Sequence, residues 1–120
     1  MANTTQLSGN LTRDPEIRYL ADGTAITTFS VATNRRWQDR VSGEWSESTS
    51  FLDVACWREL AEHAAMSLAK GDRVLLSGYL EQRTWTSTEG KVRSRVELVA
   101  QDLGPSLRYR PVSPSVDLGV

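Results

Sequence analysis

Alternating apolar and polar positions divide the chain into short extended segments separated by turn residues. Strand-like segments cover residues 6–11, 16–20, 24–33, 50–57, 73–85 and 92–100, and a further short strand is predicted over 106–110. Turn sequences such as Asp14-Pro15 and Glu89-Gly90 separate them. The pattern therefore predicts an all-β domain.

Two of these segments carry more detailed information. In 50–57 one face holds Phe51, Asp53, Ala55 and Trp57, and the other holds Leu52, Val54 and Cys56. In 24–33 the alternation of Phe29, Val31 and Thr33 is broken at Ile26. That break predicts either a β-bulge or the sharp coiling of a strand in a small barrel.

The pattern changes in two places. Residues 34–48 are polar around Ser42-Gly43, which predicts a long exposed loop or a flexible hairpin. After Trp57, apolar residues recur at helical spacing over 60–68, and Lys70-Gly71 is a stop signal. We expect one helix there.

Five main strands with one helix between the third and the fourth predict an OB-fold, a five-stranded Greek-key barrel, with the 106–110 segment as an extra C-terminal strand. A flat α+β sheet fits less well because it would leave long strand edges exposed. We expect residues 1–110 to form this domain and 111–120, with two prolines and two serines, to be a flexible C-terminal segment.

Composition limits the classes of function. The 120 residues are 39% hydrophobic and 24% charged, with a formal net charge of −1, typical of one globular domain. A strongly basic nucleic-acid-binding protein is excluded, so anion binding must come from local patches. The start shows no secretory signal, and no apolar run approaches the roughly 18 residues of a membrane span, so a cytoplasmic (nucleoid-associated) protein without membrane contact is predicted.

The residues of common catalytic sites are scattered. His63 lies on the polar side of the predicted helix, typical of a solvated side chain, and no histidine can be placed beside Cys56. A single cysteine excludes an intrachain disulfide and a cysteine-based zinc cluster. A metal-dependent nuclease would need clustered carboxylates. We therefore predict a protein that is not an enzyme and has no cofactor and no metal.

Aromatic and basic residues are interleaved where an OB-fold would expose them. They are Arg35, Arg36, Trp37, Arg40 and Trp45 in the polar stretch, Phe51 and Trp57 on one strand, Tyr79, Arg83 and Trp85 on the next, and Arg93 and Arg95 on the last. Unstacked bases of a single strand can stack on aromatic rings, each worth about 1–3 kcal/mol, while arginine neutralises phosphate. The set predicts binding of single-stranded nucleic acid without strong sequence preference.

Ordinary structural roles remain as alternatives for some of these residues. Trp57, next to the helix start, could equally be a core residue. Trp37 and Trp45 have few apolar neighbours, and Trp85 lies near a hairpin tip, so these three are harder to bury. Arg93 and Arg95 could form no more than a solvated strand face.

The chain resembles the bacterial single-stranded DNA-binding protein family over roughly residues 6–110. The resemblance lies in several motifs in the same order: Gly9-Asn10-Leu11, 14–19, 23–33, 51–61 with its Trp57-Arg58-Glu59-Leu60 centre, 70–74, Gly78-Tyr79-Leu80 and Arg83-Thr84-Trp85. It implies an OB-fold that assembles as a homotetramer wrapped by DNA. Residues 103–109 are similar to the actinobacterial branch, in which an extra C-terminal strand clamps neighbouring subunits.

The resemblance also implies residue roles. The family's stacking aromatics fall on Trp37, Phe51, Trp57 and Trp85, and positions on or near the DNA backbone fall on Arg35, Arg36, Arg40, Arg83, Lys70 and Arg73. The role of Trp45 is inferred only from its position among the aromatic and basic residues, and not from the resemblance. Single-stranded DNA is the expected partner, in replication, recombination and repair.

The chain departs from the family in two ways. Asp53 puts negative charge between Phe51 and Trp57, where it is either neutralised by a nearby arginine or weakens binding. The family's long tail with an acidic tip, which recruits other proteins, is missing before Val120, as in a trimmed core or a tailless paralogue, so recruitment by that route is not expected. These departures keep open an alternative, an OB-fold protein-docking module with weak nucleic-acid binding.

Cys56 faces away from the stacking aromatics. In a homo-oligomer with two-fold axes a lone cysteine can meet its own copy, so an intersubunit disulfide at Cys56 is one hypothesis. A buried free thiol is the favoured alternative, given the reducing conditions of the cytosol.

Overall fold

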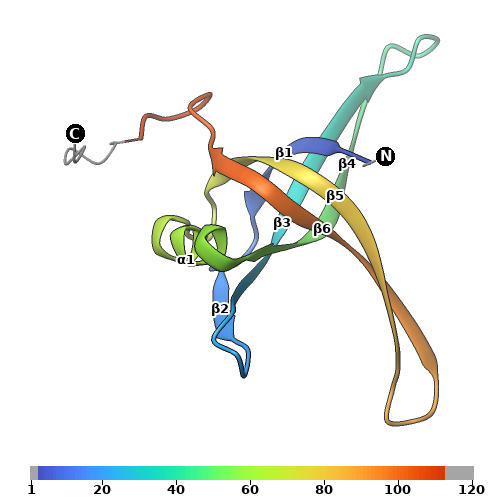
Figure 1. The fold of residues 1–120 in the computed structure, drawn as a ribbon. Helices are drawn as coiled ribbons and strands as arrows, with labels where there is room; N and C mark the ends of the chain where they lie inside the picture. Colours follow the sequence, from blue (N-terminus) through green and yellow to red (C-terminus); the bar gives the residue numbers. More distant parts are fainter. Residues whose placement is uncertain (1–2, 113–120) are drawn as a thin grey trace.

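Six strands and one helix make up the part of the protein that a computed structural model describes, residues 3–112. In chain order they are β1 (Thr5–Leu11), β2 (Glu16–Tyr19), β3 (Ala25–Gln38), β4 (Trp45–Trp57), α1 (Arg58–Ser67), β5 (Arg73–Thr86) and β6 (Val92–Pro105). The strands form one sheet in the order β1-β5-β6-β4-β3-β2 (Figure 1). The predicted helix and all main strands are present.

The sheet closes into a barrel because β1 has two partners. It lies antiparallel to β5 over most of its length and pairs with β3 through Asn10 and Leu11. On the other side, β4 and β6 run parallel over three residues of each strand, beginning at Asp53 and Glu97. β2 is an additional short strand that pairs with β3. The predicted OB-fold, a five-stranded barrel with the helix between its third and fourth strands, is confirmed.

The barrel interior is filled by side chains that alternate along the strands. The largest fully buried ones include Phe29, Val31, Val54, Val74 and Leu98. Burying each stabilises the fold by about 1.5–3 kcal/mol. These same alternations point the intervening residues outward, so the core determines which side chains reach the barrel surface.

Helix α1 explains the break in alternation on β3. It packs against β3 and β4, and the Thr27 hydroxyl donates a 2.6 Å hydrogen bond to the carbonyl of Ala61. Ala25, Ile26 and Thr27 are therefore all buried. The register between β3 and β4 shows no shift, so a β-bulge does not account for the break on β3; the shift lies instead between Ser77 and Gly78, in the β5–β6 pairing.

Two long hairpins, β3–β4 and β5–β6, extend from the barrel in different directions (Figure 1). Of the two alternatives predicted for residues 34–48, the hairpin is confirmed and the loop is wrong, because β3 and β4 stay paired up to Gln38 and Trp45. Both faces of this extension are exposed, so most of its residues are polar on both sides and the sequence shows no alternation. Asp39 shapes the turn, accepting the backbone N–H groups of Ser42 (3.1 Å) and Val41 (2.7 Å), and these bonds lower the pKa of Asp39.

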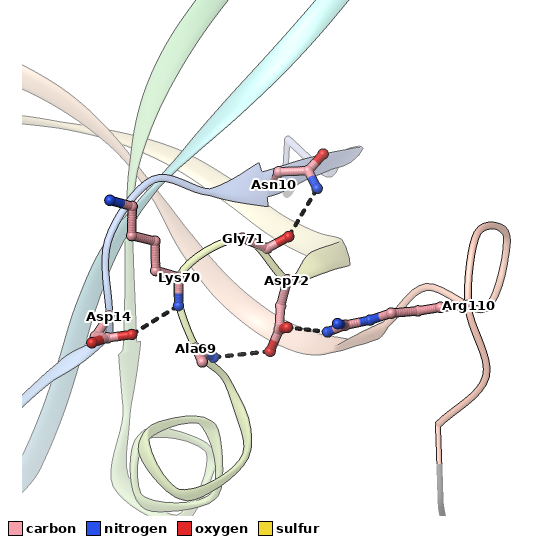
Figure 2. Close-up of polar contacts among 7 residues, drawn as sticks. All are labelled: Asn10, Asp14, Ala69, Lys70, Gly71, Asp72 and Arg110. Atoms are coloured by element: carbon pink, nitrogen blue, oxygen red, sulfur yellow. Dashed lines mark hydrogen bonds and ion pairs between the residues drawn. The ribbon is translucent and has the colours of Figure 1, made fainter.

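The segment after β6 does not form the predicted strand over 106–110. Ser106 makes the last backbone bond to β5, donating to the carbonyl of Arg73, where β5 begins. Beyond that point the described chain offers no partner strand. Instead the segment turns back and Arg110 pairs with Asp72, whose other oxygen accepts the N–H of Ala69 at 2.9 Å (Figure 2).

The structure describes only the first two residues of the expected C-terminal segment. Of the predicted flexible stretch 111–120, residues 113–120 lie outside the described residues. Among the helices described within residues 3–112, none is long and apolar enough to cross a membrane.

Candidate nucleic-acid interface

A hollow of about 400 Å³ lies on the outer surface of the barrel, lined by residues from β2 to β6 and the turn before β2. We call it the groove; its lining includes Arg18, Asp53, Arg83, Trp85, Arg95 and Glu97. The strand register brings these residues together, because Asp53 pairs with Glu97 and Arg83 pairs with Arg95. Paired residues project to the same side of a sheet.

The charges in the groove are largely balanced by ion pairs. Arg83 Nε lies 2.8 Å from Glu97 Oε1, and Arg95 Nε lies 3.6 Å from Asp53 Oδ2. A third pair joins Arg13 and Glu16 at the rim. The predicted neutralisation of Asp53 by an arginine is therefore present. A groove with paired charges attracts phosphate less strongly than a row of free arginines would.

Exposed aromatic rings continue from the groove along the β3–β4 hairpin. Phe51 is 69% exposed, Trp45 61% and Trp85 45%. Phe51 and Trp45 are an even number of residues from Trp57 on β4, so all three project from the same face. Trp57 itself is partly buried, so it lies between the two predicted alternatives, an exposed stacking ring and a core residue.

Trp37 lies on the opposite face of that hairpin. It pairs with Ser46, whereas Trp45 pairs with Gln38. Each tryptophan has its own arginine: Arg35 lies 5.6 Å from the centre of the Trp37 ring, and Arg36 lies 5.0 Å from that of Trp45. The structure thus divides the predicted aromatic set between two faces, each with an arginine stacked on a tryptophan.

Comparisons with known proteins agree with this geometry. The model of the single-strand binding protein family matches residues 2–106. The single-stranded DNA-binding protein of Paenarthrobacter aurescens is 46% identical over 112 residues, covering 91% of this chain and 66% of that protein. That of Mycobacterium leprae is 46% identical over 107 residues, covering 88% and 64%. The chain belongs to the single-strand binding protein family.

A solved structure supports the same fold. The structure described as the Plasmodium falciparum SSB complex with ssDNA superposes with a TM-score of 0.82 at 27% identity, covering 88% of this chain and 96% of that one. The chain spans about two thirds of the length of the curated relatives it matches. The predicted family resemblance is confirmed for the OB-fold core.

The other basic residues predicted for the site lie elsewhere. Lys70 follows α1, and its backbone N–H donates to Asp14 at 2.8 Å (Figure 2). Arg73 donates a 3.0 Å hydrogen bond to Ser8 and lies 5.2 Å from the centre of the Tyr109 ring. Neither residue lines the groove. Arg40 is exposed in the turn of the β3–β4 hairpin, and Arg93 is exposed on β6 opposite Trp85.

Sequence reasoning missed several residues that line the groove. Arg13, Ile17 and Arg18 come from β2 and the turn before it. The signal was available: β2 is recognisable as a strand, but only its pairing with β3 places it beside the groove. Within residues 3–112, no group of three or more His, Cys, Asp or Glu side chains could hold a metal ion.

Cys56 lies in the hydrophobic core with no exposed surface. Its thiol donates a 3.7 Å hydrogen bond to the carbonyl of Thr27, and burial raises the pKa of Cys56 to about 11. The hypothesis of an intersubunit disulfide therefore conflicts with the fold, because the sulfur would have to leave the core to meet a second copy. A buried free thiol fits this position.

We expect Cys56 to resist thiol reagents in the folded protein. Near pH 8 a thiol with a pKa of about 11 is ionised to only about one part in a thousand, and the thiolate is the reactive form. Reaction with a chromogenic disulfide reagent should be slow in buffer and complete within minutes in concentrated guanidinium chloride. Rapid labelling of the native protein, or a dimer band on a non-reducing gel after mild oxidation, would contradict this placement.

Proposed function

We propose that this protein binds single-stranded DNA without strong sequence preference and protects it, without catalysis or a cofactor. The observation that carries the proposal is the row of exposed rings, Trp45, Phe51 and Trp85, beside a groove of paired charges on an OB-fold barrel. Each ring can stack a base of any type, at about 1–3 kcal/mol per base. Membership of the single-strand binding protein family supports the same function.

The proposed path of the strand follows the geometry of the aromatic residues. Bases stack on Phe51, Trp57 and Trp85 near the groove and on Trp45 and Trp37 along the β3–β4 hairpin. The arginines proposed to contact the phosphates there are Arg35, Arg36, Arg40, Arg83, Arg93 and Arg95. Lys70 and Arg73, which lie away from the groove, contact DNA only where the strand leaves the groove and wraps further around the protein.

Assembly as a homotetramer is part of the proposal. Leu75 is 56% exposed on the outer face of β5, and Leu7 and Leu103, which are partly buried against the core, line the same hollow. An apolar surface of this kind on a small domain is typical of an association site. Light scattering during gel filtration should give the mass of four chains. We place the assembly in the cytoplasm, on DNA exposed during replication, recombination and repair.

Quenching of the intrinsic tryptophan fluorescence by a long oligothymidylate tests the function directly. We expect strong quenching because rings that stack on bases lose emission. The slope of log affinity against log salt should be about −0.7 per phosphate neutralised. We expect a shallow slope, since the groove arginines are already paired. No quenching at low salt would favour the alternative, a protein-docking module with weak nucleic-acid binding.

A further inference from the structure

Asp53 places an accessible carboxylate beside a base-stacking ring. It is two residues from Phe51 on β4, so the two side chains project from the same face about 7 Å apart. The Asp53 side chain is 42% exposed and Phe51 is 69% exposed. A base stacked on the Phe51 ring would therefore have an edge within reach of the carboxylate.

The surroundings of Asp53 reduce its repulsion of DNA but leave its oxygens available. Arg95 Nε lies 3.6 Å from Oδ2, which offsets the charge but exceeds the 2.7–3.2 Å range typical of an N–H···O hydrogen bond. Among residues 3–112 we find no hydrogen bond to either Asp53 oxygen. The neighbouring Glu97 differs, since its side chain is only 8% exposed and lies 2.8 Å from Arg83 Nε. Of these two carboxylates on β4 and β6, Asp53 is the one accessible to a ligand.

An ionised carboxylate only accepts hydrogen bonds, and this limits which base edges suit it. Cytosine and adenine present exocyclic amino groups, and guanine presents an amino group as well. Thymine and uracil carry a carbonyl oxygen where cytosine carries its amino group. The N3–H of thymine and uracil lies between two carbonyl oxygens, so a carboxylate that accepts from it also meets their negative partial charge.

We propose that Asp53 biases this protein toward single strands whose bases carry exocyclic amino groups, relative to thymine or uracil. The inference rests on the proposed function, and it adds a base preference to stacking that is itself indifferent to sequence. The competing explanation is that Asp53 only repels phosphate or occupies Arg95. That explanation predicts the same effect on every strand, whatever its bases.

The sharpest test compares oligodeoxycytidylate with oligodeoxyuridylate of equal length. The two bases are matched in size and lack the thymine methyl group, so the comparison isolates the Watson–Crick edge. Affinities of the wild-type protein and the Asp53→Asn variant would be measured by tryptophan fluorescence at pH 7.5 and one salt concentration. We expect the ratio of cytidylate to uridylate affinity to fall about fivefold in Asp53→Asn, as a charge-assisted hydrogen bond is lost.

Two further variants separate this effect from changes in folding or net charge. Asp53→Ser also removes the carboxylate and should lower the ratio in the same direction. Glu62→Gln removes one negative charge from the exposed side of α1 and should leave the ratio unchanged. Melting temperatures of all variants should remain near that of the wild-type protein, because both positions are partly or fully exposed.

The outcomes distinguish the inference from the function on which it rests. An unchanged ratio in Asp53→Asn, with both affinities raised equally, would overturn the base preference and leave DNA binding intact. Failure of the wild-type protein to bind either strand, or oligothymidylate, at low salt would overturn both. A lowered ratio in both Asp53 variants, with Glu62→Gln unaffected, supports the assignment.

Discussion

Replacement of Phe51 by alanine is expected to weaken binding of a short oligothymidylate by about 5- to 150-fold. The Phe51 ring is 69% exposed on the outer face of β4, and one aromatic platform is worth about 1–3 kcal/mol of binding free energy. Phe51 is not a tryptophan, so the change leaves all four fluorescent reporters in place. Affinity can then be measured by the same quenching titration for the variant and the wild-type protein.

The matched control for Phe51→Ala is Met66→Ala. Met66 is an apolar residue that is 84% exposed on α1, outside the groove, so its removal should leave affinity unchanged. Both variants should unfold at nearly the wild-type denaturant concentration, since each side chain is mostly in solvent. Equal affinities of the two variants would remove Phe51 from the proposed binding surface.

Replacement of Gly78 by alanine is expected to lower the free energy of unfolding by about 3 kcal/mol. A Cβ at this position would lie 2.0 Å from the carbonyl oxygen of Val99 and 2.9 Å from the Cα of Ala100. Both atoms are backbone of β6, so no side-chain rotation relieves the clash. The sheet must separate where β5 and β6 change register. Urea denaturation followed by tryptophan fluorescence measures the loss.

Gly104→Ala is the control for this position. Gly104 lies on the neighbouring strand β6, and a Cβ there would meet no atom within 4 Å. The added methyl group also reduces the conformational freedom of the unfolded chain, so stability should be unchanged or slightly higher. Equal stability of Gly78→Ala and wild type would show that the strands can move apart at this point without cost.

The extent of the strands was predictable only where one face is buried. Along 50–57 Val54 and Cys56 lie in the core while Phe51 and Asp53 on the opposite face are accessible, so the predicted alternation holds there, and Ala55 is buried as well. Along 34–48 both faces meet solvent, so the same backbone pairing leaves no trace in the hydrophobic pattern. The strand predicted over 106–110 is absent for another reason. Its residues suit a strand, but the described chain provides no partner strand beyond Arg73.

The chemistry of the site was predictable by residue type more than by arrangement. Interleaved aromatics and arginines indicate stacking and phosphate contact whatever the fold. The sequence does not say that Arg83 and Arg95 are held by carboxylates or that Arg73 turns toward Ser8. Side chains on strands that are distant in sequence meet only after the register is set.

From the sequence alone came the strand and helix pattern, the OB-fold expectation, the family resemblance and the aromatic–basic composition of the surface. These follow from local alternation, turn residues and motif order, which are visible in the order of the residues. The tertiary structure decided which tryptophans share a face, which arginines remain unpaired and that Asp53 stands accessible beside Phe51. These depend on barrel closure, because pairing of β4 with β6 brings the two halves of the groove together.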